Sequence, residues 1–343
     1  MTGRLAVVGA GAWGTALAIH AARAGLAPRL WVYEPELLAL LAETGENPWF
    51  LPGVRLPAGV RAVGSLAEAV AGADLVIVAV PSHVVRRVAS DLAPHLGAGA
   101  RVLSAAKGIE EARFARVSEI LGEVLPAYRE RIAVLSGPTF ALEVAQGRPT
   151  AAVVAAADLG LARGLQQALA APAFRLYTRT DVTGVELGGA LKNVIAIAAG
   201  ISDGLDLGMN ARAALLTRGL AEMTRLGVAL GARSSTFAGL AGIGDLILTC
   251  TGALSRNRKL GLALAGGSTL AEWQAGTRSV AEGVLTTRAA LALARKVGVT
   301  TPITAEVAAV LFEGKPPREA LAALLSREVR PEEEPDGPIG PPG

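Results

Sequence analysis

The sequence predicts an α/β domain with a mostly parallel sheet, followed by an all-α domain. In the first half, short apolar runs of strand type alternate with helical patterns. After about Asp181 the strand-like runs stop, and only helical patterns follow. A chain of 343 residues, 51% of them hydrophobic, can build two cores. We therefore expect an α/β domain at 1–180, a helical domain at 181–328, and a disordered acidic Pro/Gly-rich tail at 329–343.

Most predicted strands are continuous apolar runs rather than alternating ones, which is typical of strands buried on both faces of a parallel sheet. Their carboxyl ends carry Gly and small polar residues, and ligands bind at that edge in open α/β sheets. The predicted strands are 5–8, 30–33, 73–80, 101–104, 132–135, 150–155 and 174–177. The predicted helices of the second half are 185–201, 212–230, 235–240, 256–265, 284–297, 304–312 and 317–325.

The first strand runs directly into a Gly-x-Gly-x-x-Gly turn that opens a helix. Gly9 permits the tight turn, Gly11 lets the backbone approach a pyrophosphate, and Gly14 lets the helix pack closely on the strand. Gly25 lies where that helix would end. This order of strand, turn and helix N-terminus predicts a Rossmann-type domain that binds a dinucleotide.

The second strand ends at Glu34, twenty residues past Gly14. A carboxylate there accepts a hydrogen bond from a ribose hydroxyl and repels a 2′-phosphate, which favours NAD over NADP. Arg29 or Arg23 could compensate for that repulsion. Our hypothesis is that the protein uses both NADH and NADPH.

Composition excludes several classes of protein. The formal net charge is +3 with both signs mixed along the chain, so no concentrated basic face for nucleic acid is expected. Cys250 is the only cysteine, which fits a reducing compartment. The first strand begins by Leu5 and leaves no room for a signal peptide. The apolar stretch Val185–Ile201 contains Lys192 and Asn193, which favours a buried helix over a membrane span. We expect a cytoplasmic protein without stable membrane insertion.

Lys192 stands in an apolar helical pattern without a counter-charge. Its neighbours three and four residues away are Gly188, Gly189, Ile195 and Ala196. A lysine in such surroundings is expected in a partly buried cleft, where desolvation lowers its pKa and makes it a usable proton donor near neutral pH. The alternative is a lysine that snorkels to solvent at a domain edge.

Asp245 lies between a Gly-rich and an apolar segment, again without nearby charge. A lone acid in such a place needs a partner, and Lys192 is the candidate. The alternative is a helix N-cap, which is a common role for Asp before an apolar run.

Two further stretches carry anion-binding groups. Ser255-Arg256-Asn257 opens a predicted helix, which is typical of a phosphate site, although a solvated basic helix start is the alternative. Lys107, Gly137 and Thr139 follow two predicted strands at the ligand edge, where they can contact an anionic or carbonyl substrate. Asparagine is scarce in this chain, and two of the four, Asn193 and Asn257, lie beside basic residues. His20, His83 and His95 lack metal-ligand spacing, so we predict neither a metal site nor a Ser-His-Asp hydrolase.

Together these stretches resemble the NAD(P)-dependent glycerol-3-phosphate dehydrogenases of the soluble bacterial type. The resemblance runs from about Leu5 to Leu325. It is carried by VVGAGAWGTALA, VPSHV, AAKGIE, LSGPTFALEVAQGRPTA, GVELGGALKNVIAIAAGISDG, GLAGIGDLILTC, SRNRK and RSVAEGV.

The resemblance implies an activity and a set of site residues. Members interconvert dihydroxyacetone phosphate and sn-glycerol 3-phosphate, feed phospholipid synthesis, and are usually homodimers. Lys192 matches the catalytic lysine that gives a proton to the alkoxide formed at C2. The resemblance implies that Asp245 and Lys107 are catalytic residues together with this lysine. The positions that match cofactor contacts, together with the motif glycines and Glu34, are Gly9, Gly11, Ala12, Trp13, Gly14, Tyr33, Glu34, Lys107, Ala141, Arg256, Val280 and Glu282. The positions that match substrate contacts are Lys107, Gly137, Thr139, Lys192, Asp245, Thr249, Ser255, Arg256 and Asn257.

Two alternatives stay open. One is another dehydrogenase with a Rossmann domain and a helical second domain, of the 3-hydroxyacid or 6-phosphogluconate type; the SRNRK and LSGPTFA stretches count against it. The other is a catalytically silent NAD(P)-binding sensor. Such a sensor should have lost the lysine or the phosphate ligands, yet Lys192, Asp245, Arg256 and Asn257 are all present.

Overall fold

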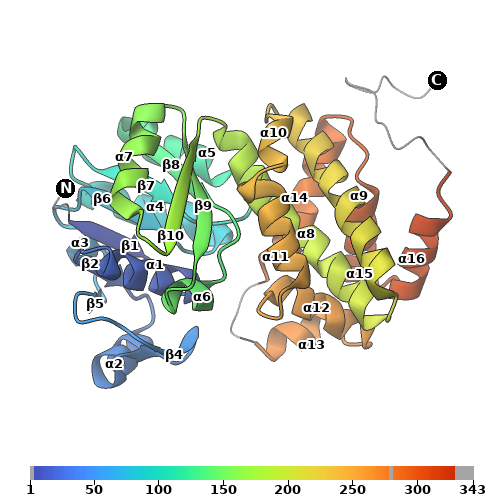
Figure 1. The fold of residues 1–343 in the computed structure, drawn as a ribbon, viewed down its shortest axis with the longest axis horizontal. Helices are drawn as coiled ribbons and strands as arrows, with labels where there is room; N and C mark the ends of the chain where they lie inside the picture. Colours follow the sequence, from blue (N-terminus) through green and yellow to red (C-terminus); the bar gives the residue numbers. More distant parts are fainter. Residues whose placement is uncertain (1–3, 278–280, 329–343) are drawn as a thin grey trace. The chain divides into compact units, whose positions relative to one another are not determined.

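The structure is a computed structural model that describes residues 4–277 and 281–328 (Figure 1). The chain divides into two compact units. The first comprises the residues up to Gly108 together with Ala115–Glu186, and the second comprises Ile109–Phe114 and the residues from Leu187 onward. The expected tail, 329–343, lies outside the described residues.

An eight-stranded sheet forms the centre of the first unit, in the order β10-β9-β8-β7-β6-β1-β2-β5. The six strands from β5 to β8 in this order are parallel. Their sequence order within the sheet is 3-2-1-4-5-6, the order of doubly wound dinucleotide-binding domains. The strands are β1 Leu5–Val8, β2 Pro28–Trp31, β5 Arg61–Val63, β6 Leu75–Val78, β7 Arg101–Ser104, β8 Ile132–Ser136, β9 Thr150–Ala156 and β10 Phe174–Arg179.

The last two strands run opposite to the others. β9 pairs antiparallel with β8, with Ser136 opposite Val153, and β10 is parallel to β9. The connection from β8 to β9 holds only the five-residue helix α6, Ala141–Ala145. That helix rises about 7.5 Å, whereas a five-residue strand spans about 16 Å. The chain therefore re-enters the sheet from the edge at which β8 left it. The prediction of a mostly parallel sheet is confirmed. The expectation that the carboxyl ends of all strands lie at one ligand-binding edge is wrong for β9 and β10, whose carboxyl ends lie at the opposite edge.

Three short strands were not predicted from the sequence. These are β5 and the hairpin formed by β3 Glu46–Asn47 and β4 Leu51–Arg55. Each is only two to five residues long, and β5 begins with the exposed Arg61. Strands this short and polar carry too little hydrophobic pattern to be recognised.

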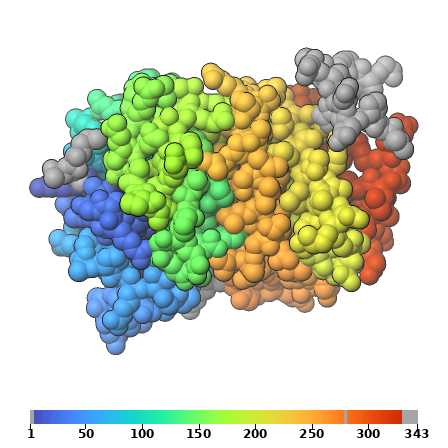
Figure 2. Space-filling model, viewed as in Figure 1, coloured from blue at the N-terminus to red at the C-terminus, as the bar shows by residue number. Residues whose placement is uncertain are grey.

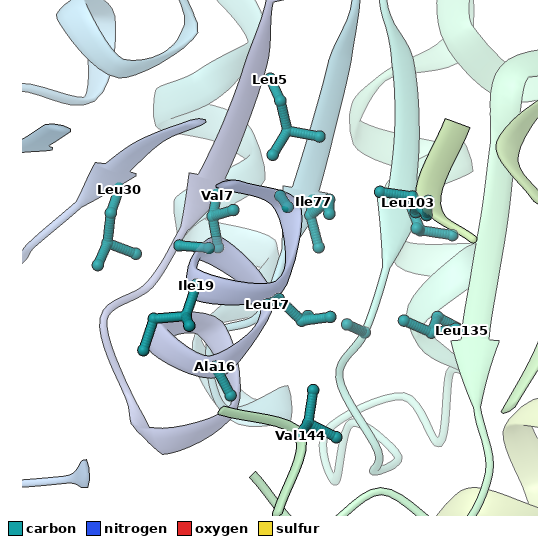
Figure 3. Close-up of a cluster of buried hydrophobic side chains, with 14 of the residues drawn as sticks. Leu5, Val7, Ala16, Leu17, Ile19, Leu30, Ile77, Leu103, Leu135 and Val144 are labelled. Atoms are coloured by element: carbon teal, nitrogen blue, oxygen red, sulfur yellow. The ribbon is translucent and has the colours of Figure 1, made fainter. Parts of the chain in front are cut away.

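Helices cover both faces of the sheet, so alternate strand residues enter two different cores. Leu5 and Val7 of β1 belong to one core, whereas Ala6 and Val8 belong to the other. Figure 3 shows α1 lying over the first of these cores, with Leu17 among the side chains around Val7. The continuous apolar runs are explained by this burial on two faces. The helices of the unit are α1 Ala12–Arg23, α2 Pro35–Thr44, α3 Leu66–Val70, α4 Val85–Leu92, α5 Val117–Val124, α6 and α7 Leu159–Leu169.

In its described residues the second unit is helical, as predicted, and contains no strand. α8 begins in the first unit and continues through the core of the second. The helices are α8 Val182–Gly204, α9 Gly208–Ala229, α10 Ser234–Phe237, α11 Asp245–Thr251, α12 Arg256–Ala265, α13 Leu270–Ala275, α14 Glu282–Lys296, α15 Pro302–Phe312 and α16 Pro317–Leu325. A π-helical turn, Leu240–Gly244, precedes α11.

Two glycines allow α12 to contact the backbone of α8. A Cβ atom on Gly261 would lie 2.1 Å from the carbonyl oxygen of Ile197, and one on Gly200 would lie 2.1 Å from that of Arg258. No side chain fits at such distances, so these positions fix where the N-terminus of α12 stands relative to α8.

α8 is the one helix in the described parts of the chain that is long and apolar enough to cross a membrane. However, 89% of its most apolar window is buried inside the protein. The prediction of a buried helix is confirmed for this stretch.

Candidate active site

The glycine-rich turn of the first unit has the geometry predicted from its sequence. Gly9 has φ of +111°, which favours glycine. A Cβ atom on Gly14 would lie 1.9 Å from the carbonyl oxygen of Gly9, so α1 packs directly on the turn. A Cβ atom on Gly11 would meet no atom within 4 Å, so the backbone there is open to a ligand. At the other end of α1, Gly25 has φ of +83°, and Leu26 N–H bonds to Ala21 O in a Schellman motif.

The N-terminus of α1 fits an acceptor-rich group such as a pyrophosphate. Its N-cap is Gly11, which offers no side chain to the first N–H groups of the helix. Nε1 of Trp13, in the first turn, is buried and has no hydrogen-bond partner among the described residues. A buried indole N–H needs an acceptor. The residues predicted to hold the cofactor phosphates, Ala12 and Trp13 included, therefore suit that role.

Asn47 supports this turn and was missed as a site residue. Its side chain is fully buried, and Nδ2 donates to Ala10 O at 2.7 Å and to Thr15 Oγ1 at 2.9 Å. Its Oδ1 accepts the backbone N–H of Phe50 at 3.0 Å. Asn47 thus ties the hairpin of β3 and β4 to the middle residue of the glycine-rich turn. The scarcity of asparagine is the only sequence signal that points to it.

Tyr33 and Glu34 follow the end of β2, at the edge where the parallel strands finish. The Tyr33 side chain is 61% exposed. Glu34 occupies the N-cap position of α2, but its carboxylate does not cap the helix. The carboxylate is therefore left to interact with other groups, as the ribose-binding role requires.

Lys107, Gly137 and Thr139 meet at the ends of β7 and β8, as the sequence predicted. Nζ of Lys107 donates to Gly137 O at 2.8 Å and to Thr139 Oγ1 at 3.2 Å. Gly137 has φ of +139° and passes close to β9, since a Cβ atom on it would lie 3.0 Å from Ala152 Cα. Ala141 is the first residue of α6, directly after this loop.

Two buried hydroxyl groups lie at the same edge and were not predicted as ligands. They belong to Ser104 at the end of β7 and Ser136 at the end of β8. Within the described residues neither hydroxyl has a hydrogen-bond partner. Two such donors at the carboxyl ends of β7 and β8 increase the capacity of this edge to bind a polar ligand.

In the second unit, Lys192 of α8 forms a buried ion pair with α11. Its Nζ lies 2.5 Å from Asp245 Oδ1 and 2.7 Å from Thr249 Oγ1. Lys192 is 6% exposed and Asp245 is 1% exposed. The predicted pairing is therefore present, and the snorkelling alternative for Lys192 is wrong. The N-cap alternative for Asp245 is also wrong, because Gly244 is the N-cap and Asp245 is the first helical residue.

The close packing of α8 on the turn before α11 brings these groups together. A Cβ atom on Gly188 would lie 2.4 Å from the carbonyl oxygen of Ala241. Gly188 therefore admits another backbone one helical turn before Lys192. Thr249 donates its hydroxyl to Asp245 O at 2.7 Å, one turn back in α11.

Electrostatics favour the charged form of Lys192 and the neutral form of its neighbour Cys250. A carboxylate 2.5 Å from the amine stabilises the ammonium form, which desolvation alone would disfavour. Burial raises the pKa of the Cys250 thiol to about 12, with Lys192 opposing that shift. The thiol is therefore protonated at neutral pH and is not a nucleophile.

α12 begins with the residues predicted to bind phosphate. Ser255 is its N-cap and accepts the N–H of Arg258, and the side chain of Arg256 is exposed. Nε of Arg258 forms an ion pair with Asp203 Oδ2 at 2.6 Å. The alternative of a solvated basic helix start is therefore wrong for Arg258. At Arg256, desolvation lowers the pKa of the guanidinium and the charge of Glu282 opposes that shift, so a ligand anion there would compete with Glu282.

Asn257 links three helices of the second unit. Its Nδ2 donates to Asn193 Oδ1 at 2.9 Å, and its Oδ1 accepts the N–H of Gly283 at 3.0 Å. A Cβ atom on Gly283 would lie 2.8 Å from that Oδ1, so only glycine fits there. Most of the predicted phosphate-binding capacity of Asn257 is thus committed to α8 and α14, and within the described residues one Nδ2 hydrogen has no hydrogen-bond acceptor.

Two further residues, Glu282 and Val280, were predicted to contact the cofactor. Glu282 is the first residue of α14 and is partly buried. Val280 lies outside the described residues. Among the residues that the structure describes, no group of three His, Cys, Asp or Glu side chains gathers as a metal site.

Comparison with known families covers most of the chain. The family model described as NAD-dependent glycerol-3-phosphate dehydrogenase N-terminus matches residues 4–162, and the corresponding C-terminus model matches 181–322. A relative from Geobacter sp. (strain M21), named glycerol-3-phosphate dehydrogenase [NAD(P)+], is 53% identical over 333 residues, covering 97% of this chain and 99% of the relative. One of the same name from Koribacter versatilis is 54% identical over 327 residues, covering 94% and 97%.

Solved structures show the same fold. The glycerol-3-phosphate dehydrogenase of Coxiella burnetii has a TM-score of 0.91 at 39% identity, covering 95% of this chain and 99% of that one. A ketopantoate reductase from Ralstonia eutropha has a TM-score of 0.59 at 20% identity, covering 94% and 99%, a likeness of fold alone. Enzymes with other substrates therefore share this architecture, and fold by itself does not choose among them.

Proposed function

Because the chain belongs to the NAD-dependent glycerol-3-phosphate dehydrogenase family, we propose that it catalyses the reversible NAD(P)H-dependent reduction of dihydroxyacetone phosphate to sn-glycerol 3-phosphate. The chain is an oxidoreductase, and NAD(P) is its cofactor. The single observation in the molecule that carries the proposal is the buried contact of Lys192 with Asp245 and Thr249.

Lys192 acts as the general acid of the reduction. The reduced nicotinamide, when bound, supplies the hydride that C2 of the substrate receives. The electron pair of the carbonyl then moves to oxygen, and this oxygen takes a proton from Nζ of Lys192. In the oxidation direction the neutral amine accepts the hydroxyl proton.

Asp245 and Thr249 act on the lysine. The carboxylate keeps Nζ protonated before the reaction and fixes its direction from one side. The Thr249 hydroxyl fixes it from a second side. An amine held by two groups loses little orientational freedom in the transition state.

The phosphate of the substrate is bound at the start of α12. Backbone N–H groups of a helix N-terminus and an exposed arginine, Arg256, favour a dianion. Ser255 and the remaining Nδ2 hydrogen of Asn257 complete this set.

In the cell, the product would feed glycerophospholipid synthesis in the cytoplasm, and the protein would act as a homodimer. Met209 and Val228, near the two ends of α9, are exposed apolar side chains, with Met209 69% exposed. Figure 2 shows α9, in yellow, at the surface of the second unit.

The test of this function is turnover with and without the substrate phosphate. NADPH or NADH should be oxidised rapidly with dihydroxyacetone phosphate and very slowly with dihydroxyacetone. Equal rates with both ketones, or faster turnover of an unphosphorylated hydroxyacid, would favour the alternative of another dehydrogenase with a Rossmann domain and a helical second domain. Binding of cofactor without any turnover would favour the silent sensor.

A further inference from the structure

The end of β2 carries an exposed aromatic ring where the adenosine part of a dinucleotide is expected. In a doubly wound sheet, the acidic residue after the second strand binds the adenosine ribose. Here that residue is Glu34, and its neighbour Tyr33 is 61% exposed. This location is where NADH and NADPH differ, since only NADPH carries a 2′-phosphate on that ribose.

Arg87 lies over the Tyr33 ring. Its guanidinium carbon is 5.6 Å from the ring centroid, within cation–π range. Arg87 stands in the first turn of α4, the helix that follows β6, and β6 pairs directly with β1. The side chain is exposed, and no carboxylate of the described residues forms an ion pair with it. An unpaired arginine therefore lies beside the expected ribose site.

The two arginines that the sequence analysis named as candidates to compensate for Glu34 do not lie at the end of β2. Arg29 donates to the carbonyl oxygens of Glu68 at 2.6 Å and Ala71 at 3.0 Å. Arg23 is the last residue of α1, about 16 Å along the helix axis from the glycine-rich turn. Neither can serve a phosphate at the end of β2, so that expectation is corrected. The neighbour of Arg87 on the same helix, Arg86, is paired with Glu123 at 2.8 Å.

We propose that Arg87 is the specificity-determining residue that lets this protein bind the 2′-phosphate of NADPH despite the presence of Glu34. The inference rests on the use of NAD(P) by the proposed function. A guanidinium presents several N–H donors in a plane, which suits a phosphate, and Tyr33 keeps it at the ribose. Glu34 favours NADH over NADPH, because its carboxylate accepts a hydrogen bond from the 2′-hydroxyl of NADH and repels the 2′-phosphate of NADPH. The balance of these two side chains gives use of both cofactors.

The experiment compares two single variants of the full-length protein that remove equal charge. Arg87→Ala and Arg86→Ala are titrated with NADPH and with NADH in the absence of substrate, and Kd is read from nucleotide fluorescence. Loss of a charge-assisted contact to phosphate should weaken NADPH binding by about 10- to 100-fold in Arg87→Ala. NADH binding should change less than about twofold, which also shows that the variant is folded. Arg86→Ala should leave the ratio of the two Kd values as in the wild type.

Glu34→Gln supplies the opposite change. It should strengthen NADPH binding and weaken NADH binding, since the repulsion and the acceptor charge are both reduced. The inference is overturned if Arg87→Ala weakens both nucleotides equally, if it changes neither, or if the wild type binds no NADPH. These measurements contain no substrate, so a failure of the proposed reaction would appear in turnover and leave the nucleotide ratio unaffected.

Discussion

The ligand sites proposed for the two units are built from different chemical groups. The first unit offers backbone, since Gly9, Gly11 and the N-terminus of α1 form its dinucleotide turn. The second unit offers buried charged side chains, since Lys192 and Asp245 meet inside a helical core. A binding site made of backbone groups requires residues that are too small to obstruct the ligand. A site made of charged side chains requires ion pairs, and separating a buried ion pair costs much free energy. Substitutions should therefore fail in different ways in the two units.

The largest effect is expected from separating the buried ion pair. Asp245→Asn leaves the Lys192 ammonium without its counter-charge, which should cost about 3–5 kcal/mol of unfolding free energy. Chemical denaturation of the purified variant measures this. The double variant Lys192→Met with Asp245→Leu should regain most of the stability but no activity. A stable, fully active Asp245→Asn variant would contradict the role given to the pair.

A smaller but still severe effect is expected at the glycine-rich turn. Gly14→Ala would place its Cβ 1.9 Å from Gly9 O and should destabilise the protein by about 3 kcal/mol. Gly11→Ala meets no atom within 4 Å, so its melting temperature should stay near that of the wild type while nucleotide Kd rises. Equal losses of stability in the two variants would contradict the assignment of Gly14 to helix packing and of Gly11 to ligand binding.

Asn47 tests whether the turn needs support from outside its motif. Asn47→Ala removes hydrogen bonds to Ala10 and Thr15 and leaves buried groups unpaired, at a cost of about 2 kcal/mol. Nucleotide affinity should fall with it, because the turn is then free to move. Asn210→Ala, on the exposed start of α9, is the matched control and should change neither stability nor affinity. An Asn47→Ala variant with wild-type nucleotide Kd would remove the positioning role.

The smallest effect concerns pH. Burial lowers the pKa of His20 below its ordinary value of 6.5, although its contact with Leu169 O opposes this shift. The unfolded chain then binds a proton more readily than the folded one, so this contribution to stability is complete above pH 6.5 and is lost as the pH falls below it. The unfolding free energy of wild type minus that of His20→Leu should therefore decrease between pH 7.5 and 5.5. A difference that stays constant over this range would contradict the buried neutral histidine.

The comparison of the units also explains what the sequence could predict. The dinucleotide turn lies within six consecutive residues, and the pairing of Lys192 with Asp245 was inferred because each lacked a local counter-charge. The antiparallel direction of β9 was missed because it depends on the length of a connection rather than on the pattern of the strand. Asn47 and Arg87 were missed because their partners are distant in sequence and neither belongs to a local motif. The tie between Asn193 and Asn257 spans 64 positions and was equally inaccessible.

The most direct test of the account is turnover by Lys192→Ala with dihydroxyacetone phosphate and saturating NADPH. Loss of the general acid should lower kcat by about 10²- to 10⁴-fold, while nucleotide Kd stays within about twofold, because the cofactor turn lies in the first unit. Lys259→Ala, an exposed lysine on α12, is the matched control and should retain wild-type kcat. A Lys192→Ala protein that keeps full turnover would contradict the assignment of the proton to this lysine.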